Sequence, residues 1–261
     1  MNTRAVGFVG GGRVTRILLE GWRRAGVSPS RVVVAEPNSE TRAGLQARFP
    51  SVETEATSAA AAQDIVFLAV HPPVVAEAAV GIRGSLKSGA VVISLAPKFT
   101  IVRLTELLGG FRRLARVIPN APSVFNVGYN PVSFGTALTA GDRAAINSLL
   151  EPLGECPEVA EENLEAYAVL TAMGPTYLWF QLQALREVAA RFGLSDAEIV
   201  PALKRMVCGS ARTLLESGLP PAAVMDLIPV KPLAEMESSV VEMYRTRLPG
   251  IYQKIQPEGS R

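Results

Sequence analysis

Short runs of apolar, mostly β-branched residues alternate with amphipathic segments through roughly the first 160 residues. The runs contain almost no polar positions, which is the pattern of parallel strands covered by helices on both faces. Apolar side chains at helical spacing predict a helix over Arg13–Ala25, with Gly26 at its C-cap. The repeated strand–helix–strand order predicts an α/β fold with a doubly wound parallel sheet. The strands are expected at Ala5–Val9, Arg31–Ala35, Ile65–Val70, Ala90–Leu95, Leu114–Ile118 and, more weakly, Pro131–Phe134.

The chain changes character near Glu161, after which the pattern predicts helices only. Ser195 and Glu198 are the two ends of a capping-box sequence, which marks one helix start. Pro201 lies early in that helix and is expected to kink it or to delay its start. The helices are expected at Glu161–Met173, Thr176–Phe192, Asp196–Glu216, Pro221–Leu227 and Leu233–Ile255.

The predicted helix over Thr176–Phe192 carries apolar residues on nearly its whole circumference. A helix of this kind is buried inside a domain or between subunits. The excess of apolar surface in this half favours a homodimer formed through the C-terminal helices. We therefore expect two domains, one over residues 1–159 with the sheet and one over residues 160–261 that is all helical.

Composition excludes several classes of protein. Hydrophobic residues make up 48% of the 261 and charged residues 19%, yet no apolar run reaches the length of a membrane span. His71 is the single histidine, and Cys156 and Cys208 are the two cysteines, which excludes multi-histidine and four-cysteine zinc sites. A net charge of +2 without basic–aromatic runs does not indicate nucleic-acid binding. Two separated cysteines form no disulfide framework, and we expect a cytoplasmic protein.

A glycine cluster joins the first predicted strand to the first predicted helix, and the segment from Gly7 to Val14 reads GFVGGGRV. Gly10 permits the tight turn, and Gly12 lets the backbone approach a pyrophosphate that lies on the helix N-terminus. Thr15 occupies the third glycine position of the Gly-x-Gly-x-x-Gly pattern and is expected to loosen helix–strand packing slightly. The motif predicts dinucleotide binding; the alternative is a glycine-rich turn beside an empty pocket.

The choice between NAD and NADP is read just after the second strand, where Glu36 follows Ala35. An acid there binds ribose hydroxyls and repels a 2′-phosphate, which favours NAD. If Glu36 points away, then Asn38, Ser39 and Arg42 are available to hold the phosphate of NADP. The sequence leaves both cofactors open.

Five motifs occur in the order and spacing found in one enzyme family. They are GFVGGG at residues 7–12, LAVHP at 68–72 (with His in place of Lys in a Val-Lys-Pro segment), VISLA at 92–96, RVIPNAP at 116–122 and GPTY at 174–177. In these motifs the chain resembles the pyrroline-5-carboxylate reductases. The resemblance implies a Rossmann-type doubly wound sheet, followed by an all-helical domain that intertwines with its twin. It also implies proline biosynthesis, with hydride transfer from NADPH or NADH to a small cyclic imine.

The substrate half departs from the family. Its hydroxyl- and glycine-rich Thr-Ser-Pro-Gly-Gly-Thr-Thr loop is replaced by DLIPVKPL at residues 226–233. This loop offers fewer donors and one cation, so the substrate is predicted only as a small imine or carbonyl compound. Two alternatives remain open: an F420-dependent NADP oxidoreductase, which shares the nucleotide-binding half, and a catalytically silent nucleotide-binding protein.

Four residues are candidates for catalysis. His71 follows the third long strand and could donate a proton to an alkoxide or amine. The resemblance suggests that Asn120 hydrogen-bonds the nicotinamide or the substrate, while Tyr177 could donate through its hydroxyl and Lys231 could bind a carboxylate. The expected cofactor contacts are Gly7, Gly10, Gly11, Gly12, Arg13, Val14, Glu36, Asn38, Ala69, Val70, Pro72, Ser94, Ala96 and Asn120.

Overall fold

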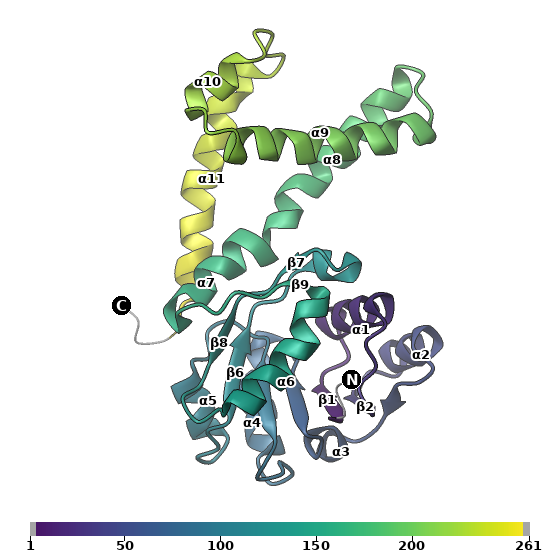
Figure 1. Cartoon of the computed structure of the whole chain (residues 1–261), viewed down its shortest axis with the longest axis vertical. Helices are drawn as coiled ribbons and strands as arrows, with labels where there is room; N and C mark the ends of the chain where they lie inside the picture. Colours follow the sequence, from purple (N-terminus) through teal and green to yellow (C-terminus); the bar gives the residue numbers. More distant parts are fainter. Residues whose placement is uncertain (1–3, 258–261) are drawn as a thin grey trace. The chain divides into compact units, whose positions relative to one another are not determined.

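The structure, a computed structural model, describes residues 4–257 of the chain (Figure 1). The chain forms two compact units. The first runs to Met173 and includes the segment from Ile251 onward, and the second is Gly174–Gly250. The predicted domain boundary between residues 159 and 160 stays a prediction, and the outer ends of those two domains, residues 1–3 and 258–261, lie outside the described residues.

A seven-stranded sheet forms the centre of the first unit, in the order β3-β2-β1-β4-β5-β6-β8. All neighbouring strands are parallel except β6 and β8, which are antiparallel. This order is the doubly wound, Rossmann-type arrangement that the sequence predicts. The strands are β1 (Val6–Val9), β2 (Val32–Ala35), β3 (Glu53–Thr54), β4 (Ile65–Leu68), β5 (Val91–Ser94), β6 (Leu114–Val117) and β8 (Val132–Phe134), and a separate pair is formed by β7 (Gly128–Tyr129) and β9 (Gly154–Glu155).

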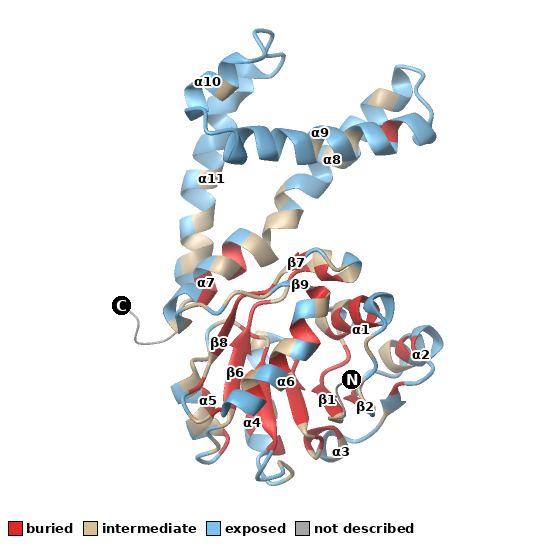
Figure 2. Ribbon diagram, in the orientation of Figure 1, coloured by how far each residue is buried: buried red, intermediate tan, exposed pale blue. Residues whose placement is uncertain are grey.

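Helices cover both faces of this sheet, and the strands between them are largely buried, except for β3 at the edge (Figure 2). The α-helices are α1 (Arg13–Ala25), α2 (Ser39–Arg48), α3 (Thr57–Ala61), α4 (Val75–Ile82), α5 (Ile101–Leu107), α6 (Ala140–Leu150) and α7 (Leu164–Tyr167). Short 3₁₀ turns are η1 (Pro72–Val74), η2 (Ala121–Phe125), η3 (Glu151–Leu153) and η4 (Glu161–Asn163), and η5 (Ala168–Ala172) is a π-helix. The predicted helix over Glu161–Met173 is thus a succession of three short helical types.

The core consists of two main apolar layers, one on each face of the sheet. On the first face Phe8, Trp22 and Phe67 form an aromatic cluster, with the rings of Phe8 and Phe67 stacked 4.8 Å apart. On the other face side chains of α4 and α5, among them Ile82 and Leu104, pack against the neighbouring positions of the strands. Side chains that alternate between two covered faces explain why the strand sequences are apolar throughout.

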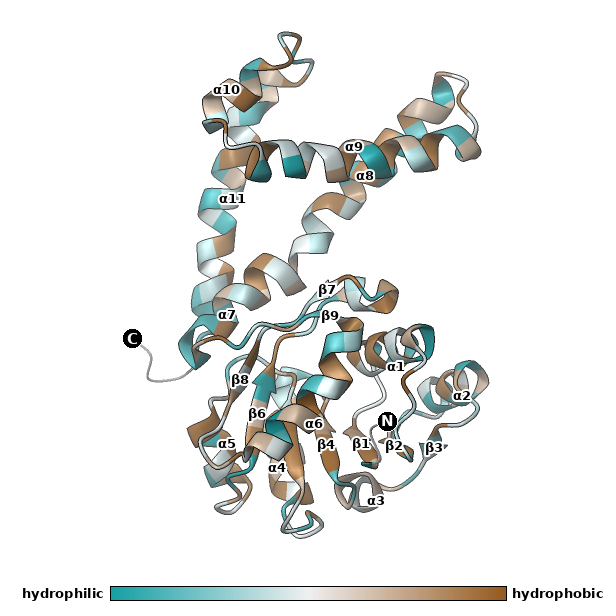
Figure 3. Ribbon diagram, viewed as in Figure 1, coloured by the Kyte–Doolittle hydropathy of each residue, from teal (hydrophilic) through white to brown (hydrophobic). Residues whose placement is uncertain are grey.

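The second unit consists of α8 (Gly174–Arg191), α9 (Asp196–Glu216), α10 (Pro221–Asp226) and most of α11 (Ala234–Ile255). The Ser195–Glu198 capping box is present, so α9 begins at Asp196 and Pro201 does not delay it. Ile199 is the one buried residue of this unit, which the structure describes in full. Apolar residues therefore lie along exposed faces of these helices (Figures 2 and 3).

Two kinds of feature are absent from residues 4–257. No helix in this part of the chain is both long and apolar enough to cross a membrane. Nor do these residues contain a cluster of three or more His, Cys, Asp and Glu side chains that could hold a metal ion.

Candidate functional site

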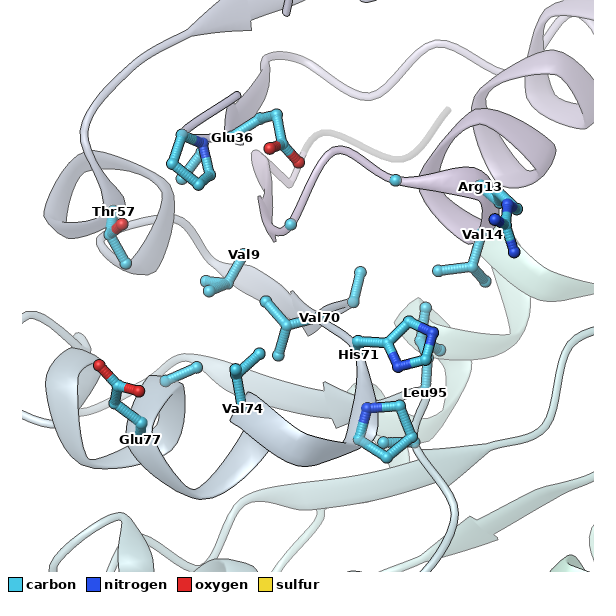
Figure 4. A pocket seen from close by; sticks show the side chains of 18 of the residues that line it. Val9, Arg13, Val14, Glu36, Thr57, Val70, His71, Val74, Glu77 and Leu95 are labelled. Carbon is cyan, nitrogen blue, oxygen red and sulfur yellow. The ribbon is translucent and has the colours of Figure 1, made fainter. Parts of the chain in front are cut away.

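A cavity of ≈ 1000 Å³ opens at the carboxyl ends of β1, β2, β4 and β5 (Figure 4). The sheet order reverses between β1 and β4, and open α/β sheets bind ligands at such a switch point. All of the lining residues belong to the first unit. Those predicted from the sequence are Gly10, Gly12, Arg13, Val14, Glu36, Ala69, Val70, His71, Pro72 and Ala96.

The glycine loop is shaped by close backbone approach on one side and open space on the other. Gly10 has φ +108°, and a Cβ there would lie 2.8 Å from the carbonyl of Ala69. A Cβ on Gly12 would meet no atom within 4 Å, so this backbone faces the open cavity. Helix α1 begins directly after it without a side-chain cap or an acidic residue in its first turn. The helix start is therefore suited to an anion.

Thr15 closes the glycine loop with a hydrogen bond. Its side chain is fully buried, and its hydroxyl donates a hydrogen bond to the carbonyl of Gly10 at 2.6 Å. The hydroxyl thus satisfies a carbonyl inside the turn, and the expectation of slightly looser helix–strand packing at the third glycine position stays a prediction.

Glu36 lies on the wall formed by the end of β2, with its carboxylate facing the glycine loop (Figure 4). One carboxylate oxygen accepts the Gly11 N–H and the other accepts the Asn38 N–H, each at 2.9 Å. A Cβ on Gly11 would lie 2.9 Å from the Cβ of Glu36, which explains why Gly11 is needed although it does not line the cavity. The Asn38 side chain caps α2, because its oxygen accepts a hydrogen bond from the Thr41 N–H at 2.8 Å.

The opposite wall follows β4 and β5. His71 is exposed and leads into η1, with its ring in the cavity near Leu95 (Figure 4). Leu95 and Ala96 come directly after β5 and line the same end. Ser94 is buried at the end of β5 and does not line the cavity. Gly7 also lies outside it, inside β1, where a Cβ would overlap the carbonyl of Ala60.

Asn120 is buried near the end of β6, outside the cavity lining. Its side-chain oxygen accepts the Tyr129 N–H at 3.1 Å, and its amide nitrogen donates to the Thr171 carbonyl at 3.3 Å. The Asn130 side chain in turn accepts the Asn120 N–H at 3.1 Å. Asn120 thus organises the chain that follows β6 and ties it to η5. Its proposed contact with the nicotinamide stays a prediction.

Tyr177 and Lys231 belong to the second unit. The Tyr177 ring meets Tyr244 edge-to-face at 5.9 Å, and burial, with Tyr244 nearby, raises the pKa of the Tyr177 hydroxyl. Its phenol therefore stays protonated at neutral pH. Lys231 is exposed in the segment between α10 and α11, where its carbonyl accepts the Ala234 N–H. The catalytic roles suggested for both residues stay predictions.

One face of the helix that follows β4 also lines the cavity, and it was not predicted. Val74, Glu77, Ala78 and Gly81 lie at positions i, i+3, i+4 and i+7 along η1 and α4. That spacing marks a single helical face and is visible in the sequence. The signal was missed because the residue types carry no recognisable chemistry.

A buried ion-pair network supports the loop after β5. The fully buried Arg116 side chain of β6 pairs with Glu165, and it donates to Glu161 at 3.0 Å. These two carboxylates also accept backbone N–H groups, Glu165 from Lys98 at 3.0 Å and Glu161 from Ile101 at 2.6 Å. Lys98 has φ +77°, which is unusual for a residue other than glycine. The network therefore holds a strained backbone next to Pro97, which lines the cavity.

Comparison with known proteins finds relatives that are similar over most of the chain. A family model described as NADP oxidoreductase, coenzyme F420-dependent, matches residues 5–98, the part that contains the glycine loop and the cavity walls. Pyrroline-5-carboxylate reductase from Escherichia coli is 28% identical over 227 residues, which is 86% of this chain and 84% of that protein. The corresponding enzyme from Corynebacterium melassecola is 29% identical, covering 85% of this chain and 83% of that one.

Solved structures show the same fold. Pyrroline carboxylate reductase from Plasmodium falciparum, solved with NADP bound, superposes with a TM-score of 0.83 at 20% identity, over 98% of each chain. The similarity thus extends over both units, well beyond the nucleotide-binding half. The fold, the five motifs and the relatives together support membership of the pyrroline-5-carboxylate reductase family of NAD(P)-dependent oxidoreductases.

Proposed function

We propose that this protein reduces the C=N bond of a small cyclic imine with NADH or NADPH, and that pyrroline-5-carboxylate is the first substrate to test. The observation that carries the proposal is the cavity at the switch point of the sheet, where Gly12 leaves open space beside an uncapped helix start. The relatives that match most of the chain support the reaction class. The product would be a cyclic amine, consistent with proline biosynthesis.

The residues of the cavity fit a dinucleotide from end to end. The pyrophosphate would lie on the backbone of Gly12 and the first turn of α1, where Arg13 supplies a positive charge. Glu36 would bind the adenosine ribose at the β2 wall, and His71, Leu95 and Ala96 would surround the nicotinamide at the β4–β5 wall. When bound, the reduced nicotinamide supplies the hydride.

Reduction of the imine carbon also places one proton on the nitrogen. His71 is our candidate for the proton donor, because it is exposed at the nicotinamide end of the cavity (Figure 4). Asn120 would act indirectly, by holding the chain between β6 and η5 in place. Tyr177 and Lys231 remain candidates for contacts with the substrate.

We further propose that the protein is a homodimer formed through the helices of its second unit. Trp179 and Phe180 on α8 are 54% and 66% exposed, and Leu215 on α9 is 80% exposed. The second unit exposes many large apolar side chains on its helices, and exposed apolar surface of this extent favours an interaction site. Cys156 and Cys208 are free thiols, which supports action in the cytoplasm.

The test is an assay of pyrroline-5-carboxylate reduction with NADH and with NADPH, together with cofactor binding measured by nicotinamide fluorescence. Gly12→Val is the decisive variant. Its backbone is extended and a Cβ there meets no protein atom, so the fold tolerates the side chain, which instead fills the space of the pyrophosphate. We expect an unchanged circular dichroism spectrum and a loss of cofactor affinity of at least about 100-fold.

His71→Ala separates chemistry from binding. It should keep cofactor affinity within about threefold of the unaltered protein and lower kcat by about 100-fold, the size expected for loss of a general acid. If Gly12→Val binds NADH and NADPH as tightly as the unaltered protein does, the cavity does not hold the pyrophosphate. If NADH and NADPH bind, but the protein oxidises reduced F420 and does not reduce the imine, the F420-dependent alternative is supported instead.

A further inference from the structure

Both oxygens of the Glu36 carboxylate are held by backbone N–H groups on opposite sides. The Gly11 N–H belongs to the glycine loop and the Asn38 N–H to the turn before α2. The carboxylate therefore cannot turn away from the cavity without leaving two N–H donors unpaired. A carboxylate has about four acceptor positions, so about two remain for ligand hydroxyl groups.

Two of the neighbouring polar side chains, Asn38 and Arg42, already have other partners. Asn38 caps α2 through its side-chain oxygen. One guanidinium nitrogen of Arg42 donates hydrogen bonds to the backbone carbonyls of Glu36 and Pro37, each at 2.9 Å. Asn38 and Arg42 are two of the three side chains named above for a 2′-phosphate, and here they stabilise the turn between β2 and α2.

The charge beyond Glu36 is also unfavourable for a phosphate. A second cavity of ≈ 440 Å³ shares Ala35, Glu36, Pro37 and Thr57 with the first and continues along the end of β2. It is lined by two carboxylates, those of Glu36 and Glu55, against the single guanidinium of Arg42. A phosphate close to Glu36 would meet like charge at short range, and this repulsion costs more where protein walls exclude water.

We propose that Glu36 makes the site selective for NADH over NADPH. The carboxylate accepts hydrogen bonds from the 2′- and 3′-hydroxyls of the adenosine ribose and repels a 2′-phosphate. The proposal rests on the proposed function, because it assumes that the cavity binds a nicotinamide dinucleotide. It departs from the Plasmodium falciparum relative, which was solved with NADP bound.

The experiment measures dissociation constants for NADH and NADPH by nicotinamide fluorescence, without a substrate. The unaltered protein should bind NADPH at least about 30-fold more weakly than NADH, the equivalent of losing a hydrogen bond to a charged group. Glu36→Gln keeps the size and removes the charge, and it should reduce this ratio at least about tenfold. Glu36→Asp keeps the charge and should retain the preference for NADH.

Glu40→Gln is the matched control. It removes the same charge from an exposed position in the first turn of α2, outside both cavities, and should leave the ratio within about twofold. The proposal is overturned if the unaltered protein binds NADPH as tightly as NADH, or if Glu36→Gln does not change the ratio. It is also overturned, together with the proposed function, if neither cofactor binds. Selective NADH binding without imine reduction would overturn the proposed substrate alone.

Discussion

At the scale of single residues, Thr15 shows how a departure from a familiar motif is compensated. Where a glycine or alanine is usual, a buried hydroxyl donates to the Gly10 carbonyl at 2.6 Å. The hydrogen bond closes the turn that carries Gly12 to the cavity. Thr15 therefore affects both the stability of the fold and the geometry of the candidate pyrophosphate site.

Thr15→Val keeps the volume of the side chain and removes the hydrogen bond. Because the Gly10 carbonyl is then left without this donor in a buried turn, we expect the free energy of unfolding to fall by about 1–2 kcal/mol. Cofactor affinity should fall as well, since the loop is less ordered before binding. Urea denaturation and nicotinamide fluorescence measure the two effects. Thr15→Ser, which keeps the hydroxyl, should retain the affinity; equal affinity in the valine variant would contradict this role.

Some residue-scale predictions depend on orientation, which a sequence does not specify. The position of Glu36 after β2 is readable from the motif, but its two backbone bonds depend on how the glycine loop folds back toward it. Asn120 was a candidate for direct contact with the nicotinamide, yet its amide bonds Tyr129 and Thr171, which approach only in the folded chain. Motifs therefore indicate where a candidate site lies more directly than they indicate how each side chain is oriented within it.

At the scale of elements, the start of α6 joins three parts of the first unit. Thr139 and Asp142 form a capping box at this helix start. The buried Asp142 carboxylate also forms salt bridges with Arg113 at 2.7 Å and with Arg4 at 3.3 Å. Burial raises the pKa of Asp142, but the hydrogen bonds from Thr139 and the two guanidinium groups outweigh it and lower the pKa below its ordinary value.

Asp142→Asn should therefore destabilise the protein in a pH-dependent way. At pH 7 we expect a loss of about 2 kcal/mol in the free energy of unfolding, from the weakened cap and ion pairs. The lowered pKa means that the carboxylate contributes fully above about pH 4 and loses its contribution as the pH falls through the folded-state pKa. Urea denaturation of both proteins between pH 7 and pH 3 should show a constant difference that shrinks only below about pH 4. A difference that stays constant down to pH 3 would rule out this origin.

The predicted elements that matched best were those with a dense local signal. The predicted bounds of α1 (Arg13–Ala25) and α9 (Asp196–Glu216) agree with the structure, because their caps are visible in the sequence. Strands β3, β7 and β9 have two residues each and were missed, since a pair of residues shows no periodicity. The antiparallel direction of β8 was also missed; its connection from β6 contains the five-residue η2 and the two-residue β7 but no crossover helix.

At the scale of the whole molecule, the two units differ sharply in how they bury apolar residues. The first has apolar layers on both faces of its sheet, whereas only Ile199 is buried in the second, fully described unit. The hydrophobic circumference of α8 was recognised from the sequence as a sign of buried surface. What covers that surface was inferred, because helical periodicity reports burial without identifying the partner.

The dimer proposal predicts a mass of about twice the 27.7 kDa of one chain in size-exclusion chromatography with light scattering. Phe180→Glu places a charge on an apolar face of α8 that is 66% exposed in one chain, and it should raise the dimer dissociation constant at least about 100-fold. Val102→Glu on α5, at 69% exposure in the first unit, is the matched control and should leave the mass unchanged. An unaltered protein that remains monomeric at tens of micromolar would contradict the dimer.

The Arg116 network has a consequence for how the protein is made on the ribosome. In this network the Glu165 carboxylate accepts the Lys98 N–H, 67 residues earlier in the chain. The Glu161 carboxylate accepts the Ile101 N–H, 60 residues earlier. A nascent chain that has emerged only as far as α6 already contains the glycine loop and every strand of the large sheet. It still lacks both carboxylates, so the strained loop beside Pro97 has no anchor and Arg116 no partner. We expect the cofactor cavity to acquire its final form late in synthesis, once Glu161 and Glu165 have left the ribosome.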